Sequence, residues 1–222
     1  MIDPGSLYFL SDTYRELLDK IGNEISLENK EQRSGNSVKA SKHGWNVWEA
    51  LLELLDMLKA NSVYELDVRG VTTYDLLYWA GSFADELHNA CREEKSLISK
   101  KFVFLKTYVE MHEGLLEEEV RNLGNIRVHF AESYYEQGQI EVADALFQKW
   151  LDADPQWIAG WTSWADCYWL WKSLGIETNY EKAEKLYQQA LFLSESEDKK
   201  FILDRLKGLN LEKNPSELIS VI

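Results

Sequence analysis

Cysteine is scarce in this sequence. Only Cys91 and Cys167 occur among the 222 residues, and both lie in segments with helical periodicity. Secreted domains that are held together by disulfides are instead dense in cysteine and rich in loops. We therefore expect both thiols to be reduced and the protein to be cytoplasmic.

Long apolar runs are missing and prolines are few. No apolar run approaches the roughly 20 residues that a membrane helix needs, and the first residues lack the basic and apolar regions of a signal peptide. We expect neither a membrane span nor a secretory leader. With three prolines in the whole chain, helices can run long without interruption.

Positive charge is in short supply. Lys and Arg number 24 against 38 Asp and Glu, which gives a formal net charge of −14. Such a chain repels a phosphate backbone and an anionic membrane surface, so nucleic acid and membrane are not expected partners. A basic or amphipathic protein or peptide fits better. The hydrophobic share of 45% and the aromatic share of 13% are enough for a folded core.

What the chain has instead is apolar periodicity at three- and four-residue spacing. This pattern predicts an all-α fold, built as an antiparallel helical array. In residues 1–27 an apolar stripe from Leu7 to Ile25 predicts an N-terminal helix. Residues 28–44 are polar and rich in Ser, Gly, Lys and Asn, and are predicted to be a linker or mobile loop. Residues 45–123 are predicted to be a region of antiparallel helices.

Three helices are expected within that region, over residues 45–59, 72–92 and 96–111. Thr72 and Asp75 have the spacing of a capping box at the start of the second. Val63–Val71 alternates loosely and predicts a short extended connection. No second strand follows to pair with it, so no sheet is predicted.

The second half of the chain is similar to itself. Ala131-x-x-Tyr134 is followed 34 residues later by Ala165-x-x-Tyr168, and 34 residues is the period of the tetratricopeptide repeat. The first copy covers residues 124–157. The second begins at Trp161 and is stretched by about six residues near 172–179.

On these residues the chain resembles the tetratricopeptide-repeat (TPR) family over about 124–208. The resemblance implies an α-α superhelix with two TPR-like repeats and a terminal capping helix over 194–206. Asp154-Pro155 is expected to cap and begin the next helix, and residues 209–222 to form a C-terminal tail or short helix. Close helix crossings would use four small residues, Ala131, Ala143, Ala165 and Ala183.

A second resemblance covers about 76–190, through LLYWAGSFADELHNA at Leu76–Ala90 and the segment Ala131–Trp171. These stretches resemble uncharacterised bacterial helical-repeat proteins that often end in a zinc-binding SEC-C tail. No cysteine follows Cys167, so that tail is absent and its role is not carried over.

Metal and catalytic chemistry find little support in the sequence. His88 and Cys91 share a helical face with Asp85, but a structural zinc site needs four ligands and a second His/Cys pair is missing. His112-Glu113 begins like a zincin motif, but no second histidine follows at the required spacing. Pairing Cys167 with His129 as nucleophile and base would place the thiol among packed tryptophans. We predict a non-enzyme without catalytic residues, metal ligands or cofactor.

Tryptophan is concentrated in the second half. The chain has nine tryptophans, and the repeat pattern predicts that Trp150, Trp161 and Trp164 are buried. The pattern explains the remaining three of this stretch less well, namely Trp157, Trp169 and Trp171. They are candidates for core or for binding surface.

The resemblance to the TPR family also implies a concave partner-binding groove, lined by the first helix of each repeat. Its positions fall here on Asn125, Val128, Glu132, Tyr135, Ala159, Thr162, Asp166 and Trp169. Tyr135 and Trp169 would supply apolar anchoring area, while Glu132 and Asp166 would attract a Lys or Arg.

The expected function is a non-catalytic protein-interaction module or adaptor that binds a peptide or helix of a partner. The alternative is an intracellular regulator or toxin-system component that senses a small ligand or peptide. A deep pocket with convergent polar groups would favour sensing, whereas an open concave face would favour the adaptor.

Overall fold

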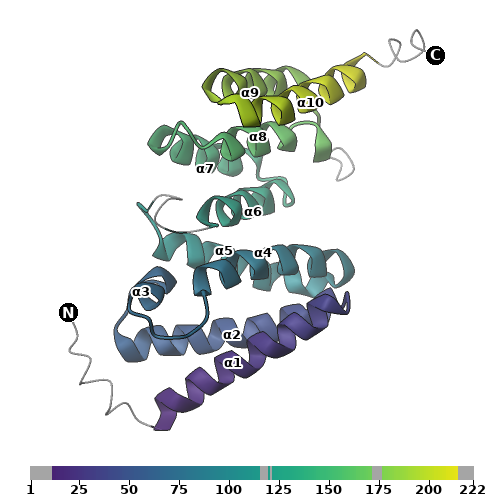
Figure 1. Cartoon of the computed structure of the whole chain (residues 1–222). Coiled ribbons are helices and arrows are strands. Elements are labelled where there is room, and N and C mark those ends of the chain that lie inside the picture. Colours follow the sequence, from purple (N-terminus) through teal and green to yellow (C-terminus); the bar gives the residue numbers. More distant parts are fainter. Residues whose placement is uncertain (1–11, 116–119, 121, 172–176, 215–222) are drawn as a thin grey trace. The chain divides into compact units, whose positions relative to one another are not determined.

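The computed structural model describes residues 12–115, 120, 122–171 and 177–214. These residues form helices and no strand, which confirms the all-α fold (Figure 1). No helix in this part of the chain is long and apolar enough to cross a bilayer. The chain divides into two compact units, Met1–Ile126 and Arg127–Ile222.

The first unit is built around a long helical hairpin. Helices α1 and α2 run antiparallel, and α4 packs against α2 (Figure 1). Its centre is an aromatic cluster of Trp48, Phe83, Phe104 and Tyr108, in which Phe104 meets Trp48 edge to face at 4.9 Å. The elements are α1 (Asp12–Arg33), α2 (Ser37–Leu58), α3 (Val63–Val68), α4 (Leu76–Glu93), η2 (Lys95–Leu97) and α5 (Ile98–Met111), followed by the start of α6 (Leu123–Tyr135).

The predicted linker at 28–44 is wrong. Residues up to Arg33 continue α1, a short turn follows, and α2 begins at Ser37. The buried positions of this stretch are Glu28, Ala40, Ser41 and Gly44. They are polar or small, so they bury surface without the large apolar side chains on which the prediction relied.

Gly44 explains why a small residue is needed there. A Cβ at this position would collide with the ring of Phe83 on α4 and would lie 2.8 Å from Glu28 Oε1. Glycine therefore allows α2 to approach both neighbouring helices closely.

The connection from α2 to α4 also differs from the prediction. Residues Val63–Val68 form a helix instead of an extended segment, and the Ser62 side chain caps it by accepting from Glu65 N. Asp75 is itself the N-cap of α4, accepting from Tyr78 N at 2.8 Å, so the expected capping box is wrong. Asp67 accepts from Leu76 N and Leu77 N, and thereby joins the end of α3 to the first turn of α4.

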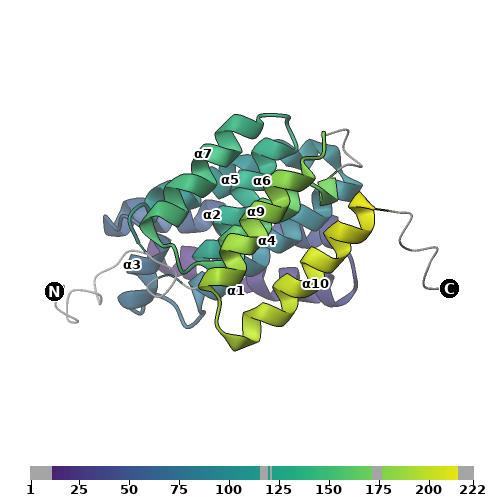
Figure 2. The same ribbon diagram turned by 90° about the horizontal axis from the view of Figure 1, so that it is seen from above.

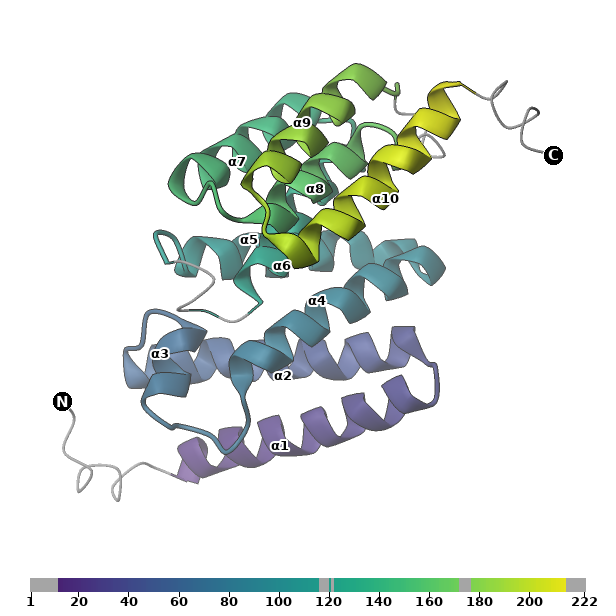
Figure 3. The same cartoon turned by 45° about the horizontal axis from the view of Figure 1, so that its top comes forward.

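The described part of the second unit contains the rest of α6 and four further helices. These are α7 (Ile140–Ala153), α8 (Ile158–Cys167), α9 (Tyr180–Leu193) and α10 (Ser196–Lys213). Helices α7 and α9 run in similar directions, and α10 follows α9 and packs against it (Figures 2 and 3). Ala131, Ala143, Ala165 and Ala183 are all fully buried, as expected for close helix crossings.

The resemblance to tetratricopeptide repeats pairs α6 with α7 and α8 with α9. In the structure α8 packs against α9 and α7, and Tyr135 of α6 is bonded to Asp144 of α7. Gly138 adopts φ +73° in the turn after α6, a conformation that glycine reaches without strain. The expected helix start at Asp154-Pro155 is wrong by about one turn, since α8 begins at Ile158. Asp154 instead ends α7, and its side chain accepts from Gln156 N in the turn.

Both ends of the chain extend past the described residues. The part of the predicted N-terminal helix before residue 12 lies outside them, and so do residues 172–176 of the expected insertion. At the other end the expected tail at 209–222 is corrected up to Lys213, which still belongs to α10. Residues 215–222 lie outside the description.

Candidate functional site

In the described part of the second unit, the Asp144 cluster joins polar side chains from several helices. It comprises Asp144 on α7, Tyr135 on α6, Trp164 and Tyr168 at α8, and Lys182 on α9. Asp144 Oδ1 accepts from Tyr135 OH at 2.9 Å and from Trp164 Nε1 at 2.6 Å. Tyr168 OH lies 2.5 Å from both carboxylate oxygens, and Lys182 Nζ lies 2.7 Å from Oδ2. One carboxylate thus connects four helices.

The electrostatics of the Asp144 cluster favour the ionised carboxylate. Burial on its own raises the pKa of Asp144, but the bonds from Lys182, Tyr168, Trp164 and Tyr135 outweigh it and lower that pKa. Burial also raises the pKa of Tyr135 and of Tyr168, so both phenols stay protonated and donate. The Lys182 ammonium lies 4.4 Å from the centre of the Tyr168 ring and adds a cation-π contact.

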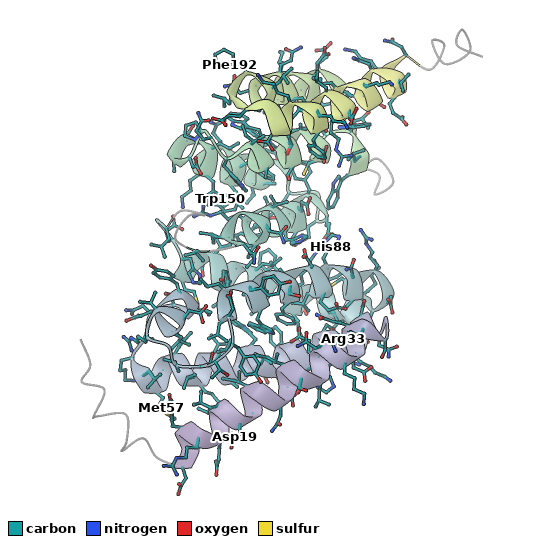
Figure 4. The ribbon with its side chains drawn as sticks, in the orientation of Figure 1. Asp19, Arg33, Met57, His88, Trp150 and Phe192 are labelled. Carbon is teal, nitrogen blue, oxygen red and sulfur yellow. The ribbon has the colours of Figure 1, made fainter. Side chains whose placement is uncertain are left out.

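Aromatic rings extend from this cluster along α7 and α8. Trp164 stacks on Phe147 at 5.8 Å, and Phe147 meets Trp150 edge to face at 6.4 Å. Trp150 and Trp164 are buried as predicted, while Trp161 is only half-buried and donates from Nε1 to Pro155 O. These rings pack α7 against α8, and Trp150 is labelled in Figure 4.

The Asp166 cluster is a second polar group. It comprises Asp166 and Trp169 at α8, Tyr187 on α9 and Arg205 on α10. Tyr187 OH donates to Asp166 Oδ1, and Trp169 Nε1 donates to the Tyr187 oxygen at 2.7 Å. An Arg205 guanidinium nitrogen lies 3.2 Å from Asp166 Oδ2. This cluster connects α8 and α9 with α10.

Asp166 is held less firmly in its charged form than Asp144. Burial raises its pKa to about 6, against the lowering effects of the Tyr187 bond and the Arg205 charge. The carboxylate of Glu132 on α6 raises it further, so the two negative charges repel each other. Glu132 stands 34 positions before Asp166 in the sequence.

The structure places the predicted groove residues in three different situations. Tyr135, Trp169, Val128 and Thr162 are buried, with exposed fractions of 0%, 6%, 9% and 4%. Glu132 and Asp166 are half-buried, with Glu132 Oε2 3.4 Å from His129 Nδ1 and Asp166 bonded as described. Asn125 is exposed and donates to Asp85 Oδ1. Ala159 is exposed as well.

Because Tyr135 and Trp169 are buried, they cannot act as the exposed anchors that the sequence predicted. Tyr135 belongs to the Asp144 cluster and Trp169 to the Asp166 cluster, so neither ring offers free area to a partner in this structure. Their hydroxyl and indole groups stabilise the contacts between helices instead. Among the predicted groove residues, Asp166 and Trp169 share the bonds of the Tyr187 hydroxyl, and the charge of Glu132 acts on Asp166.

The sequence prediction missed Asp144, Lys182 and Arg205. Asp144 and Lys182 are 38 positions apart on α7 and α9, and no local pattern links them. Gly208, three residues after Arg205, could have indicated this contact from the sequence. A glycine inside a helix lowers stability unless a close contact requires it.

Both cysteines are buried, and neither belongs to a disulfide in the described part of the chain. Burial raises the pKa of the Cys167 thiol well above its ordinary value, and the charge of Glu132 raises it further. The thiol is therefore protonated, which disfavours the nucleophile considered above. His112 is buried too, with Nδ1 2.7 Å from Tyr108 O, and its Nε2 accepts from Tyr64 N.

No model of a known protein family matches the chain, and no curated protein matches it. The resemblance to tetratricopeptide repeats therefore stays a prediction from the sequence. The Asp144 and Asp166 clusters, and the helix faces on which they lie, are the features that bear on function.

Proposed function

We propose that this protein is a non-catalytic interaction module or adaptor in the cytoplasm, which binds a peptide or helix of a basic or amphipathic partner. The binding face is formed by the acidic side chains of α6 and α8 in the second unit. One observation carries the proposal: Glu132 and Asp166 stand at equivalent positions of two helix pairs, and their charges repel each other. A cation placed between them relieves that repulsion.

The Asp144 cluster supports the proposal because it fixes the helices behind this face. Its bonds connect α6, α7, α8 and α9 through buried or half-buried side chains. A surface that is rigid before binding loses less conformational entropy when the partner arrives. The TPR-like arrangement of the two helix pairs is part of this proposal.

Charge complementarity gives the class of partner. The chain carries a net charge of −14, and the proposed face adds two half-buried carboxylates. Lys or Arg on the partner would gain from both the long-range field and the local pair. Association should then weaken as salt is added.

A charge-neutralising variant tests the proposal. Glu132→Gln keeps the size of the side chain and removes one charge of the pair, so we expect partner affinity to fall about fivefold to tenfold. The matched control is Glu141→Gln, which removes the same charge from an exposed position on α7.

The measurement has two steps. Partners are captured from the native host with the tagged full chain, and the affinity of each purified partner is then determined at low and high salt. Unchanged affinity for every partner in a folded Glu132→Gln chain contradicts the proposed face. Equal loss in Glu141→Gln would mean that overall charge, and not this face, determines binding.

A further inference from the structure

Helix α10 lies against the α8 end of the face that we propose for partner binding. We propose that α10 is a built-in occupant of this face, and that the partner helix binds by replacing it. The replacing helix would carry an Arg with a small residue three positions later, as α10 does with Arg205 and Gly208. This inference rests on the proposed function and adds its regulation and the chemistry of its partner.

The contacts of α10 are of the kind expected of a bound partner. A guanidinium nitrogen of Arg205 forms an ion pair with Asp166 Oδ2 at 3.2 Å. Gly208 follows three residues later on the same side of the helix, and a Cβ there would lie 3.2 Å from Trp169 Cη2. The ion pair of Arg205 with Asp166 and the close contact of Gly208 with the Trp169 indole are therefore adjacent contacts of one helix face.

Gly208 has no other evident reason to be glycine. It lies inside α10, where glycine costs roughly 1 kcal/mol relative to alanine. An alanine Cβ at 3.2 Å would require the Trp169 ring to give way by a few tenths of an ångström. Close approach to the indole therefore accounts for the glycine.

Occupation by α10 and occupation by a partner cation exclude each other. Asp166 has one carboxylate oxygen bonded by Tyr187 and the other by Arg205, and its side chain is only 17% exposed. A partner guanidinium can take the same position only after Arg205 has left. While Arg205 is bonded to Asp166, α10 thus blocks this position of the proposed binding face.

The attachment of α10 is weak enough to be reversible. Among its described side chains only Ile202 and Leu209 are fully buried, while Phe201 and Leu203 are about half exposed. A second ion pair of α10, between Lys213 and Glu184, is more than 30% exposed on both sides and contributes little. Helices attached by so few buried groups open locally before the whole unit unfolds.

Hydrogen exchange on the unmodified full chain tests the reversibility. We expect the amides of α10 to exchange faster than those of α8 and α9, because α10 can open while the others stay protected. Exchange of α10 only at the rate of the most protected amides of the unit would overturn the proposal.

A binding experiment tests the occlusion. The probe is a fluorescent peptide with the sequence of residues 196–213, and the full-length chain is titrated into it. Arg205→Gln loosens α10 by removing the ion pair, and Gly208→Leu does so by steric conflict with Trp169. We expect both variants to bind the peptide at least about tenfold more tightly than the unmodified chain, because the free face is populated more.

Two controls define the result. Lys207→Gln removes an equal charge from an exposed neighbour of Arg205 and should bind as the unmodified chain does. A peptide with its own Arg205→Gln replacement should lose binding to the loosened chains. If the variants speed up α10 exchange but leave peptide affinity unchanged, or do not speed it up at all, the proposal is overturned.

The outcome can be separated from that of the proposed function. A partner that depends on Glu132 but binds the unmodified and Arg205→Gln chains equally would leave the interaction face standing and overturn the self-occlusion. A partner that binds the Arg205→Gln chain more tightly supports both.

Discussion

Asp144→Ala is expected to lower the free energy of unfolding of the second unit by about 2–4 kcal/mol. The change leaves three buried or half-buried donors, Tyr135 OH, Trp164 Nε1 and Tyr168 OH, without their shared acceptor. It also leaves the Lys182 ammonium between aromatic rings without its counter-charge. Removing one member of such a network costs more than the net contribution of any single bond.

Urea denaturation at pH 7, followed by tryptophan fluorescence, measures this loss. Glu141→Ala on the exposed side of the same helix is the matched control and should change stability by less than about 0.5 kcal/mol. Asp144→Asn keeps an acceptor oxygen but loses the charge, so its effect should fall between the two. An Asp144→Ala chain as stable as the control would show that the cluster does not hold the helices together.

The dependence of the free energy of unfolding on acid pH tests the role of Asp144 in a second way. The pKa of Asp144 lies below its ordinary value in the folded chain, so the unfolded chain binds a proton more readily. The stabilisation from Asp144 is present above the ordinary pKa and is lost as pH falls through the lowered one. Asp144→Asn should therefore be least different from the unmodified chain in strong acid.

Much of the fold follows from the helical periodicity of the sequence. The apolar spacing at Leu76, Ala80 and Leu87 correctly predicts α4, and Ala131 and Ala165, predicted to lie at helix contacts, are fully buried. The prediction of a linker failed at Ala40, Ser41 and Gly44, which are buried. These residues are small and not strongly apolar, so the composition of the segment did not indicate that it packs closely. Packing against α1 and α4 outweighs local composition at these positions.

The candidate site was less predictable than the fold. Periodicity shows which residues share a helical face, and the resemblance to the TPR family placed Glu132 and Asp166 in one predicted groove. It does not show which neighbouring helix covers that face, so Tyr135 and Trp169 were expected to be accessible and are buried. The contact of Arg205 with Asp166 depends on how α10 crosses α9, which sequence spacing does not specify.

Glu28 is the buried carboxylate of the first unit, and its surroundings predict a strong dependence of stability on pH. Its side chain on α1 is 2% exposed. Trp79 on α4 donates to Oε2 at 2.8 Å, while Oε1 has no hydrogen-bond partner among the described residues. Burial raises the pKa of Glu28 to about 7, and the charge of Glu86 on α4 raises it further, against the Trp79 bond.

The sign of the effect follows from proton binding. The folded chain holds a proton on Glu28 up to about pH 7, whereas the unfolded chain releases it near its ordinary value. Between these limits the folded chain binds more protons, so the free energy of unfolding falls as pH rises. The total loss across this window is roughly 3 kcal/mol, and it is complete only above pH 7.

Glu28→Gln should remove this loss. The glutamine is neutral and nearly the same size, and its carbonyl oxygen can still accept from Trp79. We expect the variant to be more stable than the unmodified chain by about 1–3 kcal/mol at pH 8.5 and nearly equal to it at pH 5. Urea denaturation from pH 5 to 9 checks this, with the indole proton resonance of Trp79 as a local probe of the same titration.

The pH profile must be assigned to Glu28 and not to its neighbours. His43 Nδ1 on α2 lies 2.7 Å from Glu24 Oε2 on α1, so the same hairpin holds ionisable side chains besides Glu28. The comparison is therefore made between chains that differ only at residue 28, with the exposed Glu16→Gln as the control for net charge. If the two variants show the same difference from the unmodified chain at every pH, a buried charge at Glu28 does not limit the stability of the α1–α2 hairpin. If only Glu28→Gln flattens the profile, that charge destabilises the packing of α1 on α2 and α4 at neutral and alkaline pH.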